Sequence, residues 1–319
     1  GFEPTTEWIR PPVDALDSLA RADTPPPLAL VFTRLRVDPT DPLRSDPEPD
    51  LLRRVTLSDE LTMDATATLR LDLRAGDADL AALLSPATTG TPPIASSRVT
   101  GGAAQRGAAT VDGDRATSWM TPFDAAIGSS LHFDDLGPLG DALVLDQPVT
   151  QSSTITGILL ERPGADAVEA VVPEPDGNGR STIALPPAVA GAAGPLTITI
   201  TAIDPITTID RRYGDPRTLP AAISELTATE GIDVVSIDRD APIGASCGAR
   251  DPADDTTTEE GSASILSIDG SVVDFSFSTT AGALLDGDSV NARACGPVVL
   301  ESGSHDLTES PTRAPGPVS

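Results

Sequence analysis

Short runs of alternating apolar and polar residues recur along the chain. Residues 196–201 alternate leucine or isoleucine with threonine, and residues 273–278 alternate valine or phenylalanine with aspartate or serine. Residues 69–74 alternate leucine with arginine or aspartate. Successive side chains of a β-strand point to opposite faces, so a period of two predicts strands with one buried and one solvated face. The pattern therefore predicts antiparallel strands at these positions.

Glycine-containing turns separate such runs. Residues 176–179 read Asp-Gly-Asn-Gly and lie between apolar runs at 168–172 and 183–185, while Asp269 and Gly270 separate two further runs. Asn-Gly and Asp-Gly supply the positive φ that a tight hairpin turn needs. We therefore expect a hairpin at each turn.

Helical patterns are few. Residues 12–22 place Val13, Leu16 and Ala20 at helical spacing behind a proline, and residues 77–84 have the length of one or two further turns. Many short strands with Gly/Pro turns and few helices are typical of β-sandwiches. The predicted fold class is all-β: two or more sandwich or jelly-roll domains with a short N-terminal helix.

Composition divides the chain into blocks. A Pro/Thr-rich linker covers 85–93, and an acidic stretch without large apolar residues covers 250–262. The predicted blocks are a flanking β segment with the short helix (1–88), a self-contained unit (94–228), a C-terminal sandwich (229–310) and a disordered tail (311–319). The sequence leaves open whether the strands of 28–84 and 244–310 form one sandwich or two.

The charge balance excludes several functions. The chain has 319 residues, with 48 acidic residues against 21 basic ones, and a formal net charge of -27. Such a surface repels phosphate backbones, so nucleic acid is excluded as a partner. No apolar run reaches the roughly 18 residues that a membrane helix requires. All the basic residues are arginine, which either a GC-rich genome or adaptation to salt explains. The chain begins at Gly1 and ends in a Pro/Ser tail, so we expect a piece of a larger protein rather than a mature secreted one.

The middle block carries the most specific motif. Residues 94–97 read Ile-Ala-Ser-Ser, residues 110–119 read Thr-Val-Asp-Gly-Asp-Arg-Ala-Thr-Ser-Trp, and residues 223–226 read Ile-Ser-Glu-Leu. This order resembles the discoidin, or coagulation-factor 5/8 type C, domain, which opens on an A-S-S strand and ends on an I-x-E-L strand. The resemblance implies a galactose-binding-like jelly roll, a fold widely used as a carbohydrate-binding module.

The flanking motifs extend the resemblance over most of the chain. They lie at residues 5–12, 45–54 and 212–220, and are followed by Cys247 and Cys295. Their order is similar to that of the C-terminal extracytoplasmic region of actinobacterial α-(1→3)-arabinofuranosyltransferases, which are GT-C membrane enzymes of cell-wall arabinan synthesis. The resemblance implies a non-catalytic region on the periplasmic side of the plasma membrane, which binds arabinan or arabinogalactan. Its partners would be this polysaccharide and the membrane domain of the parent enzyme, whose donor is a polyprenyl-phosphate-linked arabinofuranose. No residue of this chain matches a catalytic residue of that family.

Asp112 and Asp114 form a candidate calcium site. They flank Gly113 in a predicted tight loop, where two carboxylates and free carbonyls offer the hard oxygen ligands that Ca²⁺ prefers. Discoidin-type modules often carry a structural Ca²⁺ at this place. The alternative is an Asp-Gly turn in which the side chain bonds to its own backbone.

Two aromatic positions are candidates for sugar contacts. Arg211, Arg212 and Tyr213 combine guanidinium donors with a phenol near the end of the middle block, and they are the candidate carbohydrate-binding residues. The alternative is a loop that forms salt bridges with the acidic surface. Trp119 has the ring for stacking on a sugar, but a chain with so few aromatics is expected to use it in the core.

Cys247 and Cys295 are the two cysteines of the chain. An even count in an extracytoplasmic β-domain favours a disulfide, with two buried thiols as the alternative.

The leading hypothesis for function is therefore a carbohydrate-binding region of an arabinofuranosyltransferase. A variant of it is a region that only braces the enzyme. The alternatives are a secreted adhesion or protein-interaction discoidin module, and a free-standing glycoside hydrolase with two carboxylates across a cleft.

Overall fold

The computed structural model describes residues 30–32, 51–57, 59–72, 74–148, 151–210, 214–247 and 263–309. These residues form two compact units. Unit 1 takes residues up to 69, 244–278 and 290 onward, and unit 2 takes residues 70–243 and 279–289. Strands dominate both units, so the predicted all-β class is confirmed. The helix expected at 12–22, the acidic stretch 250–262 and the tail 311–319 lie outside the described residues.

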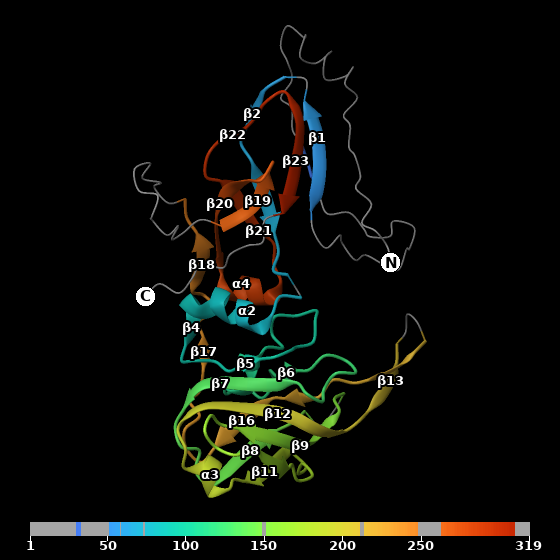
Figure 1. Cartoon of the computed structure of the whole chain (residues 1–319), viewed down its shortest axis with the longest axis vertical. Coiled ribbons are helices and arrows are strands. Elements are labelled where there is room, and N and C mark those ends of the chain that lie inside the picture. Colours follow the sequence, from blue (N-terminus) through green and yellow to red (C-terminus); the bar gives the residue numbers. More distant parts are fainter. Residues whose placement is uncertain are drawn as a thin grey trace. The chain divides into compact units, whose positions relative to one another are not determined.

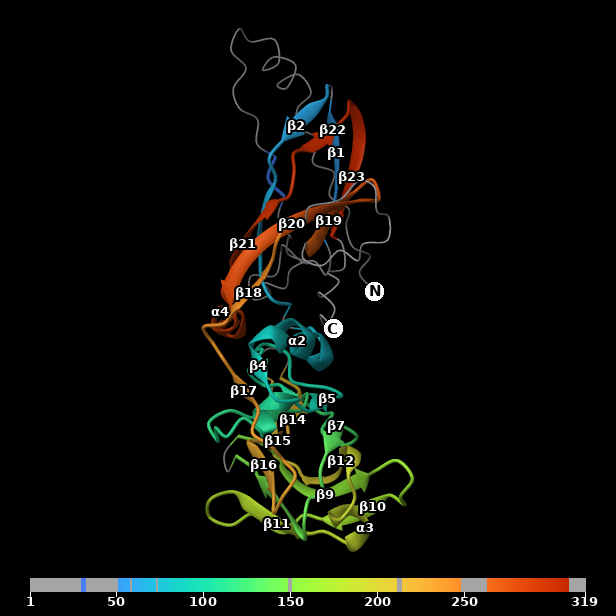
Figure 2. The ribbon, with the colours of Figure 1, turned by 90° about the vertical axis from the view of Figure 1, so that its left-hand side faces the viewer.

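Unit 1 is built on a seven-stranded sheet in the order β1-β23-β19-β20-β21-β3, with β18 also paired to β20, and on the separate pair β2-β22. Its strands are β1 (Leu52–Leu57), β2 (Leu61–Met63), β3 (Thr66–Leu69), β18 (Pro242–Ala245), β19 (Ala263–Ile268), β20 (Ser271–Thr280), β21 (Val290–Ala294), β22 (Val298–Leu300) and β23 (Gly303–Glu309). Figure 2 shows β19, β20 and β21 running side by side. The alternation at 273–278 falls in β20, as predicted.

Strands that precede unit 2 in the sequence share the sheets of unit 1 with strands that follow it. β1 pairs antiparallel with β23, β2 with β22, and β3 with β21. The strands of 28–84 and 244–310 therefore combine, which answers the question that the sequence left open. The predicted blocks 1–88, 94–228 and 229–310 are distributed over two units rather than three.

A small apolar core holds unit 1 together. Val55 and Leu57 of β1 pack with Leu307 of β23, Ile268 of β19 and the β22 residues Val298 and Leu300. The turn at Asp269 and Gly270 joins β19 to β20, and both residues have positive φ, of 50° and 84°. The hairpin predicted there is confirmed, because Asp and Gly tolerate the left-handed conformation that a two-residue turn needs.

Unit 2 contains a five-stranded sheet, β10-β9-β12-β7-β5, and a three-stranded sheet, β11-β8-β16. The strands of these sheets are β5 (Ile94–Ala95), β7 (Ser130–Leu136), β8 (Ala142–Asp146), β9 (Thr154–Glu161), β10 (Val168–Val171), β11 (Arg180–Ala184), β12 (Gly194–Asp204) and β16 (Glu225–Ala228). Figure 1 shows β7, β12 and β9 lying side by side. One continuous apolar cluster joins inward residues of both sheets, such as Leu131 and Ile198 of the first with Leu145 and Leu226 of the second. Unit 2 is thus a β-sandwich.

Short elements complete unit 2. They are α2 (Asp77–Leu84), η1 (Ser85–Ala87), β4 (Thr88–Thr89), η2 (Gly107–Thr110), β6 (Trp119–Met120), α3 (Pro187–Ala190), β13 (Thr207–Ile209), β14 (Pro216–Thr218), β15 (Ala222–Ile223), β17 (Ser236–Ile237) and α4 (Ala281–Asp286). The helix predicted at 77–84 is confirmed as α2. The ribbon of β13 and β14 extends away from the two sheets (Figure 1).

Two expectations about strands were wrong. The runs at 168–172 and 183–185 form β10 and β11, but β10 pairs with β9 and β11 with β8, so the turn at 176–179 crosses between the sheets and makes no hairpin. Asp176 still closes a tight turn there, because its carbonyl accepts the Gly179 amide. The alternation at 69–74 also does not continue as a strand past Leu69. The Asp72 carbonyl accepts the amide of Ala75 and its side chain accepts that of Arg74, which turns the chain toward α2.

Candidate functional site

The loop of Asp112 is closed by its own side chains. The Asp112 carboxylate accepts the amide of Asp114 at 3.0 Å and the hydroxyl of Thr117 at 2.8 Å, while Asp114 accepts the amide of Ala116 at 2.9 Å. Gly113 between them has a φ of 76°, which favours glycine. These are the bonds of the Asp-Gly turn that the sequence offered as the alternative to calcium.

A buried carboxylate lies beside this loop, in a row of charged residues across the three-stranded sheet. The strand register places Arg180 of β11 opposite Asp146 of β8, and Asp146 opposite Glu225 of β16. The side chain of Asp146 is 3% exposed. Three strands therefore bring an arginine and two carboxyl groups together from positions far apart in the sequence.

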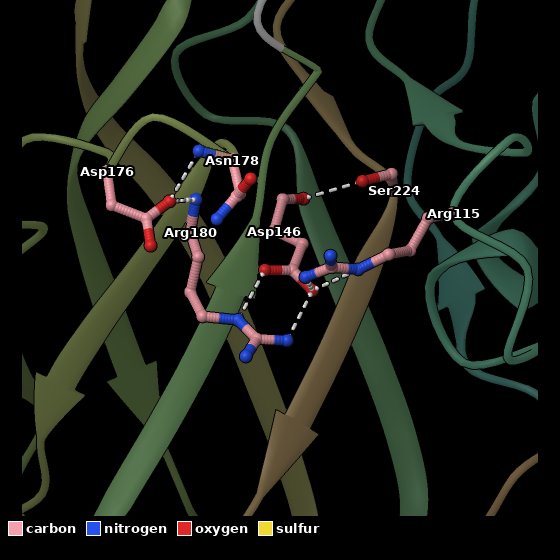
Figure 3. A network of polar contacts seen from close by, with 6 residues as sticks. All are labelled: Arg115, Asp146, Asp176, Asn178, Arg180 and Ser224. Carbon is pink, nitrogen blue, oxygen red and sulfur yellow. Dashed lines mark hydrogen bonds and ion pairs between the residues drawn. The ribbon is translucent and has the colours of Figure 1, made fainter.

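Two arginines bind the Asp146 carboxylate, as Figure 3 shows. Arg180 donates through Nε to Oδ1 at 3.0 Å, and Arg115, from the loop of Asp112, donates through Nε to Oδ2 at 2.9 Å. Burial alone raises the pKa of Asp146, but the hydrogen bonds from Arg180 and Arg115 together hold that pKa below its ordinary value. Asp146 is therefore ionised, and it fixes both guanidinium groups, since a buried charge without partners is very costly.

Backbone bonds complete the network. The Asp146 carbonyl accepts both the amide and the hydroxyl of Ser224, at 2.9 and 3.1 Å. Asp176 accepts the amides of Asn178 and Arg180 at 2.8 and 3.0 Å, which lowers the pKa of the Asp176 carboxyl. The turn at 176–179 thus positions Arg180 for its contact with Asp146.

Glu225 is the carboxyl group of this region that lacks a full set of partners. It is 7% exposed, and its Oε2 has no hydrogen-bond partner in the described part of the chain. Its carboxyl group accepts the amide of Gly113, so it lies against the Asp112 loop. Burial, with the negative charge of Asp112 next, raises the pKa of Glu225 to about 7.

One further carboxyl group, that of Glu225, lies against the loop of Asp112 and Asp114. Among the described residues, no three His, Cys, Asp or Glu side chains are grouped to hold a metal ion. A cation here would use the carboxylates of Asp112 and Glu225, the Thr117 hydroxyl and loop carbonyls, a set of oxygens that suits Ca²⁺. The buried Oε2 of Glu225, which has no hydrogen-bond partner in the described part of the chain, is the observation that supports such a site.

The other residues predicted from the sequence are divided by the structure. Arg211, Arg212 and Tyr213 lie outside the described residues, between β13 and β14. Trp119 is 0% exposed and donates through Nε1 to the Ser97 carbonyl at 2.9 Å, so its place in the core is confirmed. Cys247 and Cys295 form a disulfide, as predicted. It ties the chain just after β18 to the residue after β21, inside unit 1.

Sequence reasoning missed the network of Arg115, Asp146 and Arg180. The sequence signal nearest to it was the glutamate of the Ile-Ser-Glu-Leu motif, which was assigned to a strand without a role. Nothing in local spacing links Arg180 to Asp146, because their contact depends on strand pairing.

The fold and these sites define a disulfide-linked all-β protein whose sandwich unit carries a charged loop. In the described part of the chain no helix is both long and apolar enough to cross a membrane. No protein-family model matches the chain.

Comparison with known proteins shows which proteins the chain resembles in sequence and in structure. Over 142 residues, 44% of the chain, it is 34% identical to the α-(1→3)-arabinofuranosyltransferase of Mycolicibacterium smegmatis, of which the match covers 9%. The cryo-EM structure of arabinofuranosyltransferase AftD from Mycobacteria matches 82% of the chain with a TM-score of 0.51 at 21% identity, and the match covers 19% of that protein. A mutant of the same enzyme gives a TM-score of 0.48. The chain is thus homologous to a part of an arabinofuranosyltransferase, and it spans a small fraction of the length of these relatives.

Proposed function

We propose that this chain is a non-catalytic, carbohydrate-binding region of a membrane-bound arabinofuranosyltransferase. The observation that carries the proposal is the 34% identity to the enzyme from Mycolicibacterium smegmatis, in a chain whose larger unit is a β-sandwich. The region lies on the extracytoplasmic side of the membrane, where its disulfide is stable. There it holds arabinan or arabinogalactan while the membrane domain transfers arabinofuranose from a polyprenyl-phosphate donor.

The sandwich of unit 2 is the module proposed to bind the polysaccharide. Its Ile-Ala-Ser-Ser segment contributes β5, its Asp112 loop precedes β6, and its Ile-Ser-Glu-Leu segment contributes β15 and the start of β16. That order supports the discoidin assignment. An acidic chain with a net charge of -27 suits a neutral glycan better than an anionic one.

Binding of arabinan is tested by titration of the whole chain. Short arabinofuranose and galactofuranose oligosaccharides are added while amide resonances are followed by NMR and heats by calorimetry. We expect saturable shifts confined to residues of unit 2. No binding of any arabinan or galactan at millimolar concentration would remove the carbohydrate-binding function and leave the bracing or protein-interaction alternatives.

Calcium is part of the proposal. Asp112, Thr117 and Glu225 would hold the ion together with loop carbonyls, and the ion would neutralise the two carboxylates and fix the loop. Calorimetry with CaCl₂ after chelation should show one site, and Glu225→Gln should weaken it by at least roughly tenfold, because the variant lacks a charged oxygen ligand. The matched control is Asp114→Asn, which removes the same charge from the same loop at a residue outside this proposed ligand set. Equal affinity in wild type and Glu225→Gln would contradict this site.

A further inference from the structure

Three chain segments lie side by side where the β13–β14 ribbon leaves unit 2. Beyond the β6–β15 pair, Thr121 donates its amide to the Ala221 carbonyl and Asp124 donates to the Thr218 carbonyl. Phe123 lies between these two bonds, in a turn that the Ala125 amide closes on the Pro122 carbonyl at 3.4 Å. On the other side Leu219 donates its amide to the Ile206 carbonyl, one residue before the first β13–β14 pair. Phe123, Leu219 and Ile206 are therefore the large apolar residues of three segments joined by backbone hydrogen bonds, and we call these three residues the apolar row.

Two of these three residues are exposed, and Leu219 is partly buried. Phe123 is 47% exposed and Ile206 is 46% exposed, and among the described aromatic residues Phe123 alone is exposed. Phe133 and Trp119, in the same unit, are 4% and 0% exposed. Only 3% of the residues are aromatic, and yet the ring of Phe123 is exposed to water and not buried in the core. Folding gains little from a ring in that position.

An ion pair fixes the segment next to this ring. Asp124 accepts Nη1 of Arg217 at 2.8 Å and the amide of Thr218 at 2.7 Å. The backbone of Asp124 has a φ of 59°, in the left-handed region that residues with a side chain rarely adopt. The Arg217 hydrogen bond lowers the pKa of Asp124, which is therefore ionised at neutral pH. The ring is consequently attached to a rigid segment, with a charged pair that is itself 45% and 39% exposed beside it.

The base of the β13–β14 ribbon, at Ile206 and Leu219, is also held in place. The hydroxyl of Ser153, which is 1% exposed, donates to the Leu219 carbonyl at 2.8 Å and accepts the Ile206 amide at 3.1 Å. A two-stranded ribbon alone is marginally stable in water. These contacts hold its base against the sandwich, so that the apolar row keeps its shape without a ligand.

An exposed ring beside paired polar groups is the arrangement that recognises a sugar. The C–H face of a sugar ring is apolar and stacks on an aromatic face, while its neighbouring hydroxyls accept from a guanidinium and donate to a carboxylate. We propose that the row of Phe123, Leu219 and Ile206, with Asp124 and Arg217, is a binding site for a neutral saccharide. This inference rests on the carbohydrate-binding function proposed above and assigns it to particular residues.

The charges favour a saccharide over a lipid surface. Exposed phenylalanine and isoleucine residues at the base of a protruding ribbon are also found in segments that insert into membranes. The single cation of this site, Arg217, is however paired with Asp124, and the chain carries a net charge of -27, which opposes binding to anionic bilayers.

Variants of the whole chain test the site. Short arabinofuranose and galactofuranose oligosaccharides are titrated against wild type, Phe123→Ala, Phe123→Trp and Arg217→Gln. We expect Phe123→Ala and Arg217→Gln to weaken binding by roughly tenfold or more, as truncated anchors do, and Phe123→Trp to retain it with a change in tryptophan fluorescence. Val171→Ala, at an 82% exposed residue of β10, is the matched control and should bind as wild type does. Thermal midpoints of all variants should stay close to wild type, because the changed side chains are exposed.

The outcomes separate this site from the proposed function. Saccharide binding that Phe123→Ala and Arg217→Gln leave unchanged would overturn this site and keep the carbohydrate-binding function. No saccharide binding by wild type would overturn both. Sedimentation of wild type, but not of Phe123→Ala, with vesicles of phosphatidylcholine and phosphatidylglycerol would assign the row to a membrane and overturn the saccharide proposal.

Discussion

Glu225 shows how one residue couples the core of unit 2 to its charged loop. Its carboxyl group is almost buried, sits opposite ionised Asp146 across two strands, and has an oxygen without a partner in the described part of the chain. A group in this position is stable only as the neutral acid or beside a cation. The residue therefore opposes folding at alkaline pH unless an ion is bound.

Replacing Glu225 by Gln should stabilise the calcium-free chain at high pH. The pKa of Glu225 is raised to about 7 in the folded state, so the folded chain binds the proton more tightly than the unfolded one. Stability from this group is present at low pH and is lost as pH rises through about 7. At pH 8 in chelator we expect Glu225→Gln to raise the free energy of unfolding of unit 2 by about 2 kcal/mol, and to change little at pH 4. Urea unfolding at both pH values measures this, and a variant less stable than wild type at pH 8 would contradict it.

His305 in unit 1 gives a second pH dependence. Its Nδ1 lies 2.7 Å from the Asp269 carboxylate and its Nε2 lies 2.8 Å from the Glu301 carbonyl, so both nitrogens face acceptors. The hydrogen bond with Asp269, and then that with Glu301, raise the pKa of His305. The stabilisation is complete below the unfolded pKa of about 6.5 and is lost as pH rises through the higher folded pKa.

Unit 1 of wild type should therefore lose stability as the pH rises above about 6.5. The variant His305→Gln should show a smaller change, because its side chain does not titrate. Amide hydrogen exchange in β19 and β23, measured as a function of pH, gives the stability of unit 1 in each protein. Parallel curves for the two proteins would show that the imidazolium contributes nothing.

At the scale of elements, close backbone approaches fix the loops of the sandwich. Gly231 has a φ of 80°, and a Cβ there would lie 2.4 Å from the Pro138 carbonyl oxygen and 3.0 Å from that of Gly137. Gly164 has nearly the same φ, 81°, and a Cβ there meets nothing within 4 Å. The two glycines separate the cost of backbone conformation from the cost of a clash.

The variant Gly231→Ala should be clearly less stable than Gly164→Ala. Both variants should lose about 1 kcal/mol of unfolding free energy, because alanine is disfavoured in the left-handed region. Gly231→Ala should lose about 1–3 kcal/mol more, because two backbone carbonyls must move. Thermal unfolding followed by circular dichroism measures the difference. Equal midpoints would mean that the 137–138 segment moves aside freely.

A strand could be predicted from the sequence where its own residues alternate between apolar and polar. The alternations at 196–201 and 273–278 gave β12 and β20, and the Asp269–Gly270 turn gave its hairpin, because periodicity and turn chemistry act locally. Strand partners were not predictable in this way. The 176–179 turn has the residues of a hairpin, but its flanking strands belong to opposite sheets.

The candidate site shows the same limit. Trp119 and the disulfide were predicted, since scarce aromatics fill cores and paired cysteines bridge. The contacts of Asp146 with Arg115 and Arg180 span 31 and 34 residues. The first depends on where the loop of Asp112 lies, and the second on the pairing of β8 with β11. The exposed state of Phe123 is equally invisible in a sequence, since an aromatic residue is expected to be buried.

At the scale of the whole molecule, the disulfide serves one unit. It joins residues 48 positions apart, both in unit 1, whose apolar core is the smaller of the two. Closing a loop of this length restricts the unfolded chain and is worth about 4 kcal/mol. A sheet with so few buried side chains depends strongly on such a link.

Loss of the disulfide should loosen unit 1 alone. In the double variant Cys247→Ser with Cys295→Ser we expect faster amide exchange in β19 to β23, by the equivalent of about 4 kcal/mol or complete loss of protection. Strands β7, β9 and β12 of unit 2 should keep their protection. Exchange followed by mass spectrometry reports both units in one experiment, and equal loss in both would show that they unfold together.

The pairing of β1 with β23 also determines when unit 1 can complete its fold during synthesis. Arg54 and Asp306, which form an ion pair across these strands, lie 252 residues apart. At synthesis rates of about 5–20 residues per second, the first strand waits roughly 10 to 50 s for its partner to leave the ribosome. The sandwich of unit 2 emerges whole in that interval. The N-terminal strands must therefore stay unpaired beside a finished domain, and the time of greatest exposure to aggregation or to a chaperone falls before the last strand appears.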